Sequence, residues 1–129
     1  MKAQLNPSTL KGTLPAIASK SFAHRLLMAA ALADKPTTVN CPLRSEDILA
    51  TARVLTSLGA EIRDLGDRFE VTPIASSERG IQTNALLDCG ESGTTERFIL
   101  PIVGALGHGG ALTGHGRLPQ RPLSPLYEV

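Results

Sequence analysis

Three short stretches of the chain combine basic side chains, hydroxyl groups and glycine in a way that suits the binding of small anions. In the first stretch, Lys20 lies between two serines and Arg25 follows Ser21 by four residues. Side chains at this spacing lie on one face of a helix. A helix that begins here would add unpaired backbone N–H groups and the positive end of its dipole. The pattern predicts a phosphorylated compound at Ser21 and Arg25, with a second anion near Lys20.

The second stretch, Ser92-Gly93-Thr94, lies where a predicted strand turns into a helix, and Arg97 follows one helical turn later. Because glycine has no Cβ atom, a ligand can approach the backbone closely at Gly93. In the third stretch, Arg117 and Arg121 flank a turn that contains proline. Two guanidinium groups on a stiff loop suit bidentate contacts with a carboxylate or a phosphate.

Each stretch, taken alone, also fits an ordinary structural explanation. These explanations are a serine that caps a helix, a glycine required by its backbone dihedral angles, and a solvated basic loop. The glycine-rich loop with lysine that cradles nucleotide phosphates does not occur in the sequence.

The remaining groups that could carry chemistry indicate no metal or redox site. His24, His108 and His115 lack the spacing of metal ligands, so we interpret them as surface or packing residues. Cys41 and Cys89 belong to no paired cysteine motif. Two buried or partly buried thiols are the favoured interpretation, and a disulfide between them stays open.

The bulk properties predict one globular domain or part of one. The chain has 129 residues and a formal net charge of +1, which disfavours non-specific binding to nucleic acid or an anionic membrane. The first residues, Met1 to Gln4, lack the apolar run of a signal peptide, and no apolar run is long enough to span a bilayer. We therefore expect a cytoplasmic protein with no nucleic-acid or membrane partner.

The apolar pattern predicts helices that alternate with strands. Leu26, Leu27, Ala30 and Ala33 recur at helical spacing, and Pro36 stops that helix. The other elements follow from capping residues, β-branched runs and alternation. The predicted helices are 19–33, 45–58 and 92–106, and the predicted strands are 37–41, 60–63, 68–72, 85–89 and 109–113.

Three segments are predicted with less regular structure. Residues 2–17 are predicted as a short strand followed by an extended loop, and residues 73–83 as a loop that contains a short strand. Residues 122–129 are predicted to begin a further helix. The order of elements indicates an α/β (α+β) fold with one complete unit and the start of a second.

The three stretches together resemble the N-terminal part of the enolpyruvyl transferases, and within that family the branch that acts on shikimate 3-phosphate. The sister branch, which acts on UDP-N-acetylglucosamine, has a Lys-Asn pair near its start and usually a later loop cysteine. Here Ser21 follows Lys20, and no cysteine follows Cys89. The matching pieces occur in family order across nearly the whole chain: Ser19-Lys20-Ser21 with Arg25, Ser45-Glu46-Asp47-Ile48, Leu58-Gly59-Ala60, Gly90-Glu91-Ser92-Gly93-Thr94 with Arg97, and Arg121-Pro122-Leu123.

The resemblance implies transfer of the carboxyvinyl group of phosphoenolpyruvate to the 5-hydroxyl of shikimate 3-phosphate, with release of phosphate, on the path to chorismate and the aromatic amino acids. It implies no metal or organic cofactor. The acid–base residues of the family belong to a part that this chain does not cover, so no catalytic residue is expected here and the chain alone is expected to be inactive. The corresponding binding positions are Lys20, Ser21 and Arg25 for shikimate 3-phosphate, Lys20, Gly93 and Arg121 for phosphoenolpyruvate, and Thr94 and Arg97 in supporting places.

The resemblance also implies an architecture. The family is a two-domain monomer, an inside-out barrel of repeated βαβαββ-type units. Residues 1–17 would be a strand and lead-in that pair with the second domain, and residues 18–129 would be part of the first domain. The end of the chain just inside a predicted helix would then be a truncation. Exposed apolar edges of such a fragment would favour self-association, which is one alternative for this chain.

The sequence departs from the family pattern at a few positions. Ala18 stands where glycine is usual, Glu91-Ser92 where many members have Asn-Ala, and Phe98 where many have proline. We interpret these as subfamily variation, and they leave open how the site responds to glyphosate, an inhibitor of the family. Three alternatives stay open: a non-catalytic module that retains weak affinity for shikimate 3-phosphate, a self-associating fragment, and a relative of the branch that acts on UDP-N-acetylglucosamine.

Overall fold

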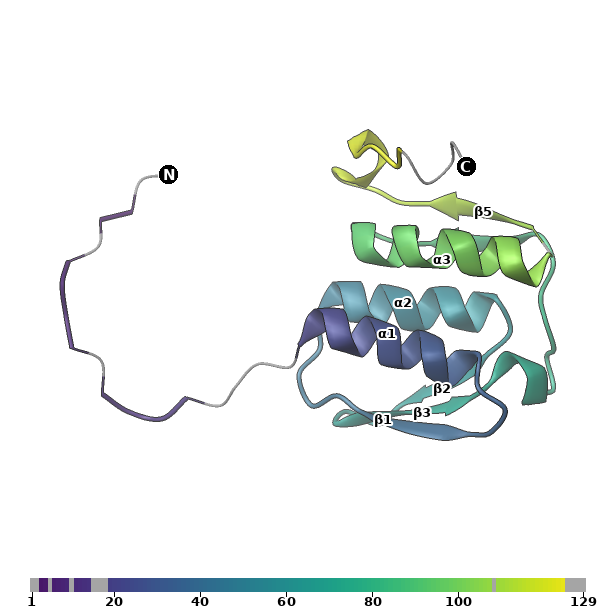
Figure 1. The fold of residues 1–129 in the computed structure, drawn as a ribbon, viewed down its shortest axis with the longest axis horizontal. Coiled ribbons are helices and arrows are strands. Elements are labelled where there is room, and N and C mark those ends of the chain that lie inside the picture. The colour runs from purple at the N-terminus through teal and green to yellow at the C-terminus, as the bar shows by residue number, and fades with distance from the viewer. Residues whose placement is uncertain (1–2, 5, 10, 15–18, 108, 125–129) are drawn as a thin grey trace.

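The computed structural model describes residues 3–4, 6–9, 11–14, 19–107 and 109–124. Within them the chain alternates helices and strands, which confirms the predicted α/β fold (Figure 1). The elements are α1 (Lys20–Ala31), β1 (Thr37–Asn40), α2 (Glu46–Ser57), β2 (Glu61–Asp64), β3 (Arg68–Thr72), the 3₁₀ turn η1 (Ile74–Ser76), β4 (Ala85–Asp88), α3 (Gly93–Leu106), β5 (Gly110–Thr113) and the 3₁₀ turn η2 (Leu118–Gln120).

The strands form two sheets with the helices between them (Figure 1). The first sheet is antiparallel, with β3 in the middle, so that Val71 lies opposite both Thr37 of β1 and Ile62 of β2. The second sheet pairs β4 with β5 in parallel, with Ala85 opposite Gly110. Helix α3 connects these two strands, as a parallel pair requires.

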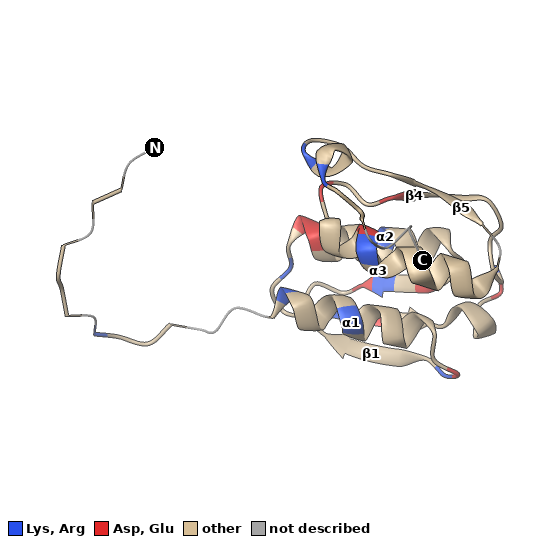
Figure 2. Ribbon diagram, turned by 45° about the horizontal axis from the view of Figure 1, so that its top comes forward, with Lys and Arg blue, Asp and Glu red and all other residues tan. Residues whose placement is uncertain are grey.

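The three helices begin at the same edge of the molecule (Figure 1). Ser19, Ser45 and Ser92 cap α1, α2 and α3, and each hydroxyl accepts a hydrogen bond from the backbone N–H three residues later. Basic positions on α1 and α3 lie toward this edge (Figure 2). The edge therefore gathers the positive ends of three helix dipoles and several basic side chains.

One apolar core holds the helices against both sheets. Helix α1 contributes Leu27, α2 contributes Leu55, and α3 contributes Ile99, all fully buried. Phe69 and Leu87 complete this core from β3 and β4.

Apart from the segment 73–83, the predicted helices and strands from residue 19 to 113 match the observed ones with shifted ends. In the hairpin of β2 and β3, Phe69 and Val71 are buried, whereas Ile62 is only partly buried. The 3₁₀ turn η2 was not predicted.

The strand predicted within residues 73–83 is wrong, because this segment forms η1 and turns. The hydroxyl of Ser77 and the backbone N–H of Glu78 both donate to the carboxylate of Glu61, at 3.0 and 3.1 Å. The N–H of Gln82 donates to the carbonyl of Leu58 at the end of α2. These contacts with a side chain and a helix end replace the backbone ladder that a strand would need.

Two terminal predictions fall partly on residues outside the described ranges. The described part of residues 2–17 forms no strand. Residues 122–124 form no helix, while the rest of the helix predicted to reach Val129, and Ala18, lie outside the described residues.

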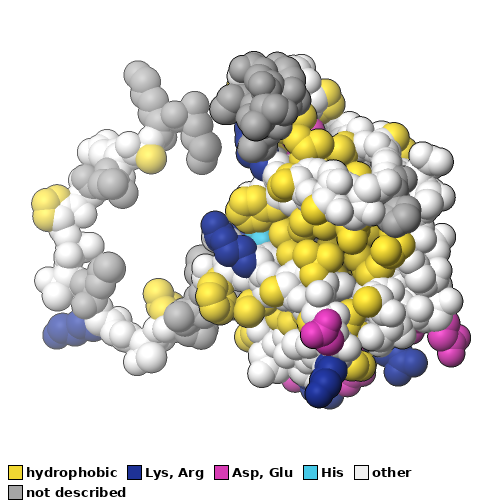
Figure 3. All heavy atoms as spheres, turned by 45° about the vertical axis from the view of Figure 1, so that its right-hand side comes forward, with side chains coloured by type: hydrophobic (Ala, Val, Ile, Leu, Met, Phe, Trp, Pro, Cys, Tyr) yellow, Lys and Arg dark blue, Asp and Glu magenta, His cyan; other side chains and the backbone are white. Residues whose placement is uncertain are grey.

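Apolar side chains gather in a broad area on one face (Figure 3). Phe22 on α1 is 63% exposed, and Leu26 and Leu32 are also exposed. An apolar area of this kind is typical of a surface that packs against further protein.

Two glycines with positive φ differ in how much space surrounds them, so their substitution distinguishes steric overlap from backbone strain. Gly59 ends α2 at φ 117°, and a Cβ atom there would overlap the carbonyl oxygen of Gly80. Gly66 has φ 91° and open space around the same position. We expect Gly66→Ala to lower the free energy of unfolding by about 1–2 kcal/mol through strain alone. Gly59→Ala should cost about 3 kcal/mol or more, because backbone must also move. Urea unfolding followed by circular dichroism measures both, and equal losses would contradict the overlap at Gly59.

Candidate functional site

The first predicted stretch lies on the first two turns of α1. The Nη1 atom of Arg25 donates to the carbonyl of Ser21 at 2.9 Å and also contacts its hydroxyl, so the two side chains share one helical face. The same guanidinium lies over the ring of Phe98 on α3, 5.0 Å from its centroid. Lys20 points elsewhere and forms an ion pair with the carboxylate of Asp47 in the first turn of α2. The stretch therefore presents two separate cationic positions.

The second and third stretches converge at Gly93, the first residue of α3. A Cβ atom at Gly93 would lie 2.8 Å from Nη1 of Arg97 and 3.1 Å from Nη1 of Arg121. Arg97 donates to the carbonyls of Gly93 and Pro122, at 3.3 and 2.8 Å. Two guanidinium groups thus meet beside the bare Cα atom of Gly93. Thr94 follows in the same first turn and is half-buried.

The turn that carries Arg121 is held in place by one apolar side chain. Leu118 in η2 is 1% exposed, and it packs where Gly93 and Gly114 lack a side chain. Arg117, Gln120 and Arg121 line a polar cavity of about 280 Å³ around this turn. The anchor brings Arg121 to α3 while the polar side chains stay exposed.

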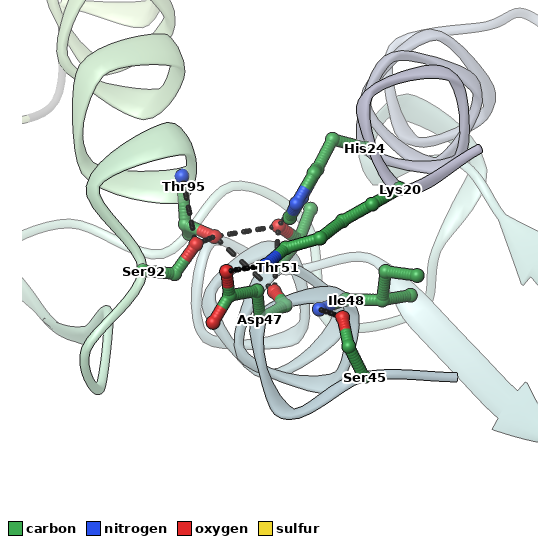
Figure 4. A network of polar contacts seen from close by, with 8 residues as sticks. All are labelled: Lys20, His24, Ser45, Asp47, Ile48, Thr51, Ser92 and Thr95. Atoms are coloured by element: carbon green, nitrogen blue, oxygen red, sulfur yellow. Dashed lines mark hydrogen bonds and ion pairs between the residues drawn. The ribbon is translucent and has the colours of Figure 1, made fainter. Parts of the chain in front are cut away.

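A buried chain of polar contacts connects the beginnings of the three helices (Figure 4). His24 Nδ1 on α1 lies 2.6 Å from Thr51 Oγ1 on α2, which lies 2.7 Å from Thr95 Oγ1 on α3. Thr95 Oγ1 in turn donates to the hydroxyl of Ser92 at 2.7 Å. All four residues are at most 1% exposed.

Sequence reasoning missed this chain, since it treated His24 as a surface or packing residue. One signal was present, because His24 lies on the same helical face as Leu27 and Met28, which point into the core. The threonines gave no such signal, because their partners lie far away in the sequence.

Burial lowers the pKa of His24 below its usual value of 6.5; the nearby charges of Lys20 and Arg25 lower it further, while Asp47 opposes them. His24 is therefore neutral near pH 7. The free thiols of Cys41 and Cys89 are buried, as favoured from the sequence, and burial raises the pKa of both, that of Cys89 to about 11.

Two further properties bear on the kind of site. Among the residues that the structure describes, no three His, Cys, Asp or Glu side chains are grouped to hold a metal ion. The described helices include none with the length and hydropathy needed to cross a membrane.

The depressed pKa of His24 predicts a pH dependence of stability. Below about pH 6.5 the histidine of the unfolded chain binds a proton, whereas His24 of the folded protein stays neutral to lower pH. The free energy of unfolding therefore decreases as the pH is lowered. This contribution is complete above pH 6.5 and changes by at most about 1.4 kcal/mol per pH unit. His24→Asn removes the titrating group, so its stability should fall less between pH 7.5 and 5.5. Urea unfolding at both pH values tests this, and an equal fall in the two proteins would refute it.

Comparisons with known proteins show the family of this chain. Residues 5–129 match the family model described as EPSP synthase (3-phosphoshikimate 1-carboxyvinyltransferase). The relative of that name from Halobacterium salinarum is 40% identical over 130 residues, covering 100% of this chain and 30% of its own length. The one from Clostridioides difficile is 37% identical over 134 residues, covering 98% of this chain and 30% of its own length.

A structure of EPSP synthase from Acinetobacter baumannii superimposes with a TM-score of 0.73 at 26% identity. The match covers 87% of this chain and 25% of that protein. The chain thus spans about 30% of the length of the curated relatives that it matches. With a family match over nearly all of its length and a shared fold, the chain belongs to the EPSP synthase (3-phosphoshikimate 1-carboxyvinyltransferase) family.

Proposed function

We propose that this chain supplies anion-binding groups to an enzyme that transfers the carboxyvinyl group of phosphoenolpyruvate to the 5-hydroxyl of shikimate 3-phosphate. The family match supports the reaction. The observation that carries the proposal for this chain is the meeting of Arg97 and Arg121 beside bare Gly93, at the edge where all three helices begin. The reaction has two anionic substrates, and this edge holds cationic groups at more than one place.

Shikimate 3-phosphate is proposed to bind at Lys20, Ser21 and Arg25. The contact of Arg25 with the hydroxyl and carbonyl of Ser21 supports this, since it points a guanidinium and a hydroxyl to the same side of the first turns of α1. The ring of Phe98 supports the guanidinium from behind without neutralising it. Arg25 therefore keeps its full charge for a phosphate.

Phosphoenolpyruvate is proposed to bind at Lys20, Gly93 and Arg121, with Thr94 and Arg97 in support. The ends of Arg97 and Arg121 occupy the space that a side chain at position 93 would fill, so both guanidinium groups lie against the backbone where α3 begins. Lys20 is half-exposed and held by Asp47, so it can turn toward an anion between α1 and α2. The ion pair also keeps the ammonium group near this edge while no ligand is bound.

The proposed chemistry is addition through a tetrahedral intermediate followed by elimination of phosphate. The cationic groups of this chain would neutralise the phosphates and the carboxylate of the substrates, which lowers the energy of the charged transition states. Proton transfer would fall to groups outside residues 1–129, and none of the residues proposed here is given an acid–base role.

We also propose that residues 1–17 and 18–129 have separate roles, the first pairing with a second domain and the second forming part of the first domain. The described residues of the first segment are exposed and run away from the body of the molecule (Figure 1). The exposed apolar area on the other segment supports packing against further protein.

A chimera tests the proposed function. This chain would replace the aligned segment of the Clostridioides difficile relative, and phosphate release would be measured with both substrates together and with each alone. We expect release only with both substrates, and none from the isolated 129-residue chain. Arg121→Gln should raise the KM for phosphoenolpyruvate about tenfold or more, equal to about 1.4 kcal/mol of binding. Arg63→Gln, an exposed arginine on β2, is the matched control and should change nothing. A folded chimera without release, or equal effects of the two variants, would contradict the proposal.

Gly93→Ala provides a second test in the same chimera. The added methyl group would overlap the ends of Arg97 and Arg121, so both guanidinium groups must shift. They can do so because arginine side chains are flexible. We expect a higher KM for phosphoenolpyruvate and little change in the KM for shikimate 3-phosphate. Gly104→Ala is the control, since it adds a methyl group to the same helix with nothing within 4 Å. Unchanged kinetics in Gly93→Ala would argue against an anion at this glycine.

A further inference from the structure

Thr51 occupies the middle of the only buried polar chain that the described residues form between α1, α2 and α3. Its hydroxyl contacts His24 on α1 and Thr95 on α3, and its oxygen also lies 3.3 Å from the carbonyl oxygen of Asp47 on its own helix. The side chain is fully buried, so no solvent substitutes for these partners. Figure 4 shows the hydroxyl between the two neighbouring helices.

The hydrogens in the chain can be arranged in one direction. His24 Nδ1–H donates to Thr51, the hydroxyl of Thr51 donates to Thr95, and that of Thr95 donates to Ser92. This order uses every short contact and leaves His24 Nε2 as a bare nitrogen, which agrees with its lack of a described partner. A valine at position 51 would keep the shape but strand the Nδ1–H of His24 in the core.

The two ends of the chain lie beside the two proposed substrate positions. His24 immediately precedes Arg25 and lies one turn after Lys20 on α1. Thr95 and Ser92 flank the first turn of α3, which contains Gly93. A hydroxyl that holds His24 at a fixed distance from Thr95 therefore also holds the residues proposed to bind shikimate 3-phosphate at a fixed distance from those proposed to bind phosphoenolpyruvate.

We propose that Thr51 is a positioning residue, which sets the spacing of α1 and α3 at the substrate edge without touching either substrate. The inference rests on the proposed function for its consequence, since the spacing matters only if both helices bind substrate. It differs from simple packing, because a side chain of the same shape without the hydroxyl would not perform it.

The chain offers a matched control on the same helix. The hydroxyl of Thr56 on α2 donates to the carbonyl four residues earlier, that of Ala52, at 2.9 Å, and among the described residues it makes no hydrogen bond to α1 or α3. Thr51→Val and Thr56→Val thus remove the same group from the same helix. Thr51→Ser retains the hydroxyl and should restore the wild-type behaviour.

The first measurement uses ¹H–¹⁵N spectra of the 129-residue chain without ligand. In Thr51→Val we expect backbone signals of residues 20–25 and 93–97 to shift together, and His24 to lose the Nδ1–H signature in its imidazole ¹⁵N spectrum. Thr56→Val and Thr51→Ser should shift neither group. Shifts confined to α2 in Thr51→Val would overturn the proposal.

The second measurement titrates shikimate 3-phosphate and phosphoenolpyruvate separately into each variant. Thr51→Val should weaken the binding of both at least fivefold, whereas Thr56→Val and Thr51→Ser should bind as the wild type does. Equal binding by Thr51→Val and the wild type would overturn the positioning role while the proposed function stands. If the wild type binds neither substrate, the proposed function loses its support, and the ligand-free spectra alone decide about Thr51. If Thr51→Val does not fold, Thr95→Val breaks the chain at the next hydroxyl and is judged by the same outcomes.

Discussion

The unpaired backbone N–H groups at the start of a helix must find partners, and this molecule places three such starts along one edge. Serine caps satisfy one N–H group in each helix and leave the others with their partial positive charge. Basic side chains are then added where positive charge is already concentrated. Glu46 and Asp47 in the first turn of α2 and Glu96 in the first turn of α3 offset part of this positive charge.

The structure holds these basic groups in place without neutralising most of them. Arg25 and Arg97 donate to backbone carbonyls, and the ring of Phe98 lies under Arg25. Carbonyls and an aromatic face orient a guanidinium but leave its net charge available. Lys20 is the exception, since Asp47 neutralises it. A ligand at Lys20 must therefore compete with a carboxylate, whereas a ligand at Arg25 does not.

Much of the fold was predictable because its limits are set by local chemistry. Ser45 and Gly59 bound α2, and Ser19 caps the start of α1. The segment 73–83 was predicted incorrectly because its conformation depends on Glu61, which is distant in sequence. For the site, the spacing of Ser21 and Arg25 was readable from helical periodicity. The meeting of Arg97 with Arg121 and the contacts of Thr51 were not, because both depend on how separate elements pack.

Leu118 has a consequence for how the site responds to its surroundings. Arg121 is exposed to solvent, but the turn that carries it is fixed by one buried leucine. Added salt would screen the attraction between the guanidinium and an anion, yet it would leave the turn where it is. Cooling weakens the hydrophobic effect that holds Leu118, so low temperature would loosen the position of the Arg121 guanidinium. Salt instead shortens the distance over which this guanidinium attracts an anion. The attraction between Arg121 and an anion thus depends on ionic screening, whereas the position of Arg121 depends on the hydrophobic effect.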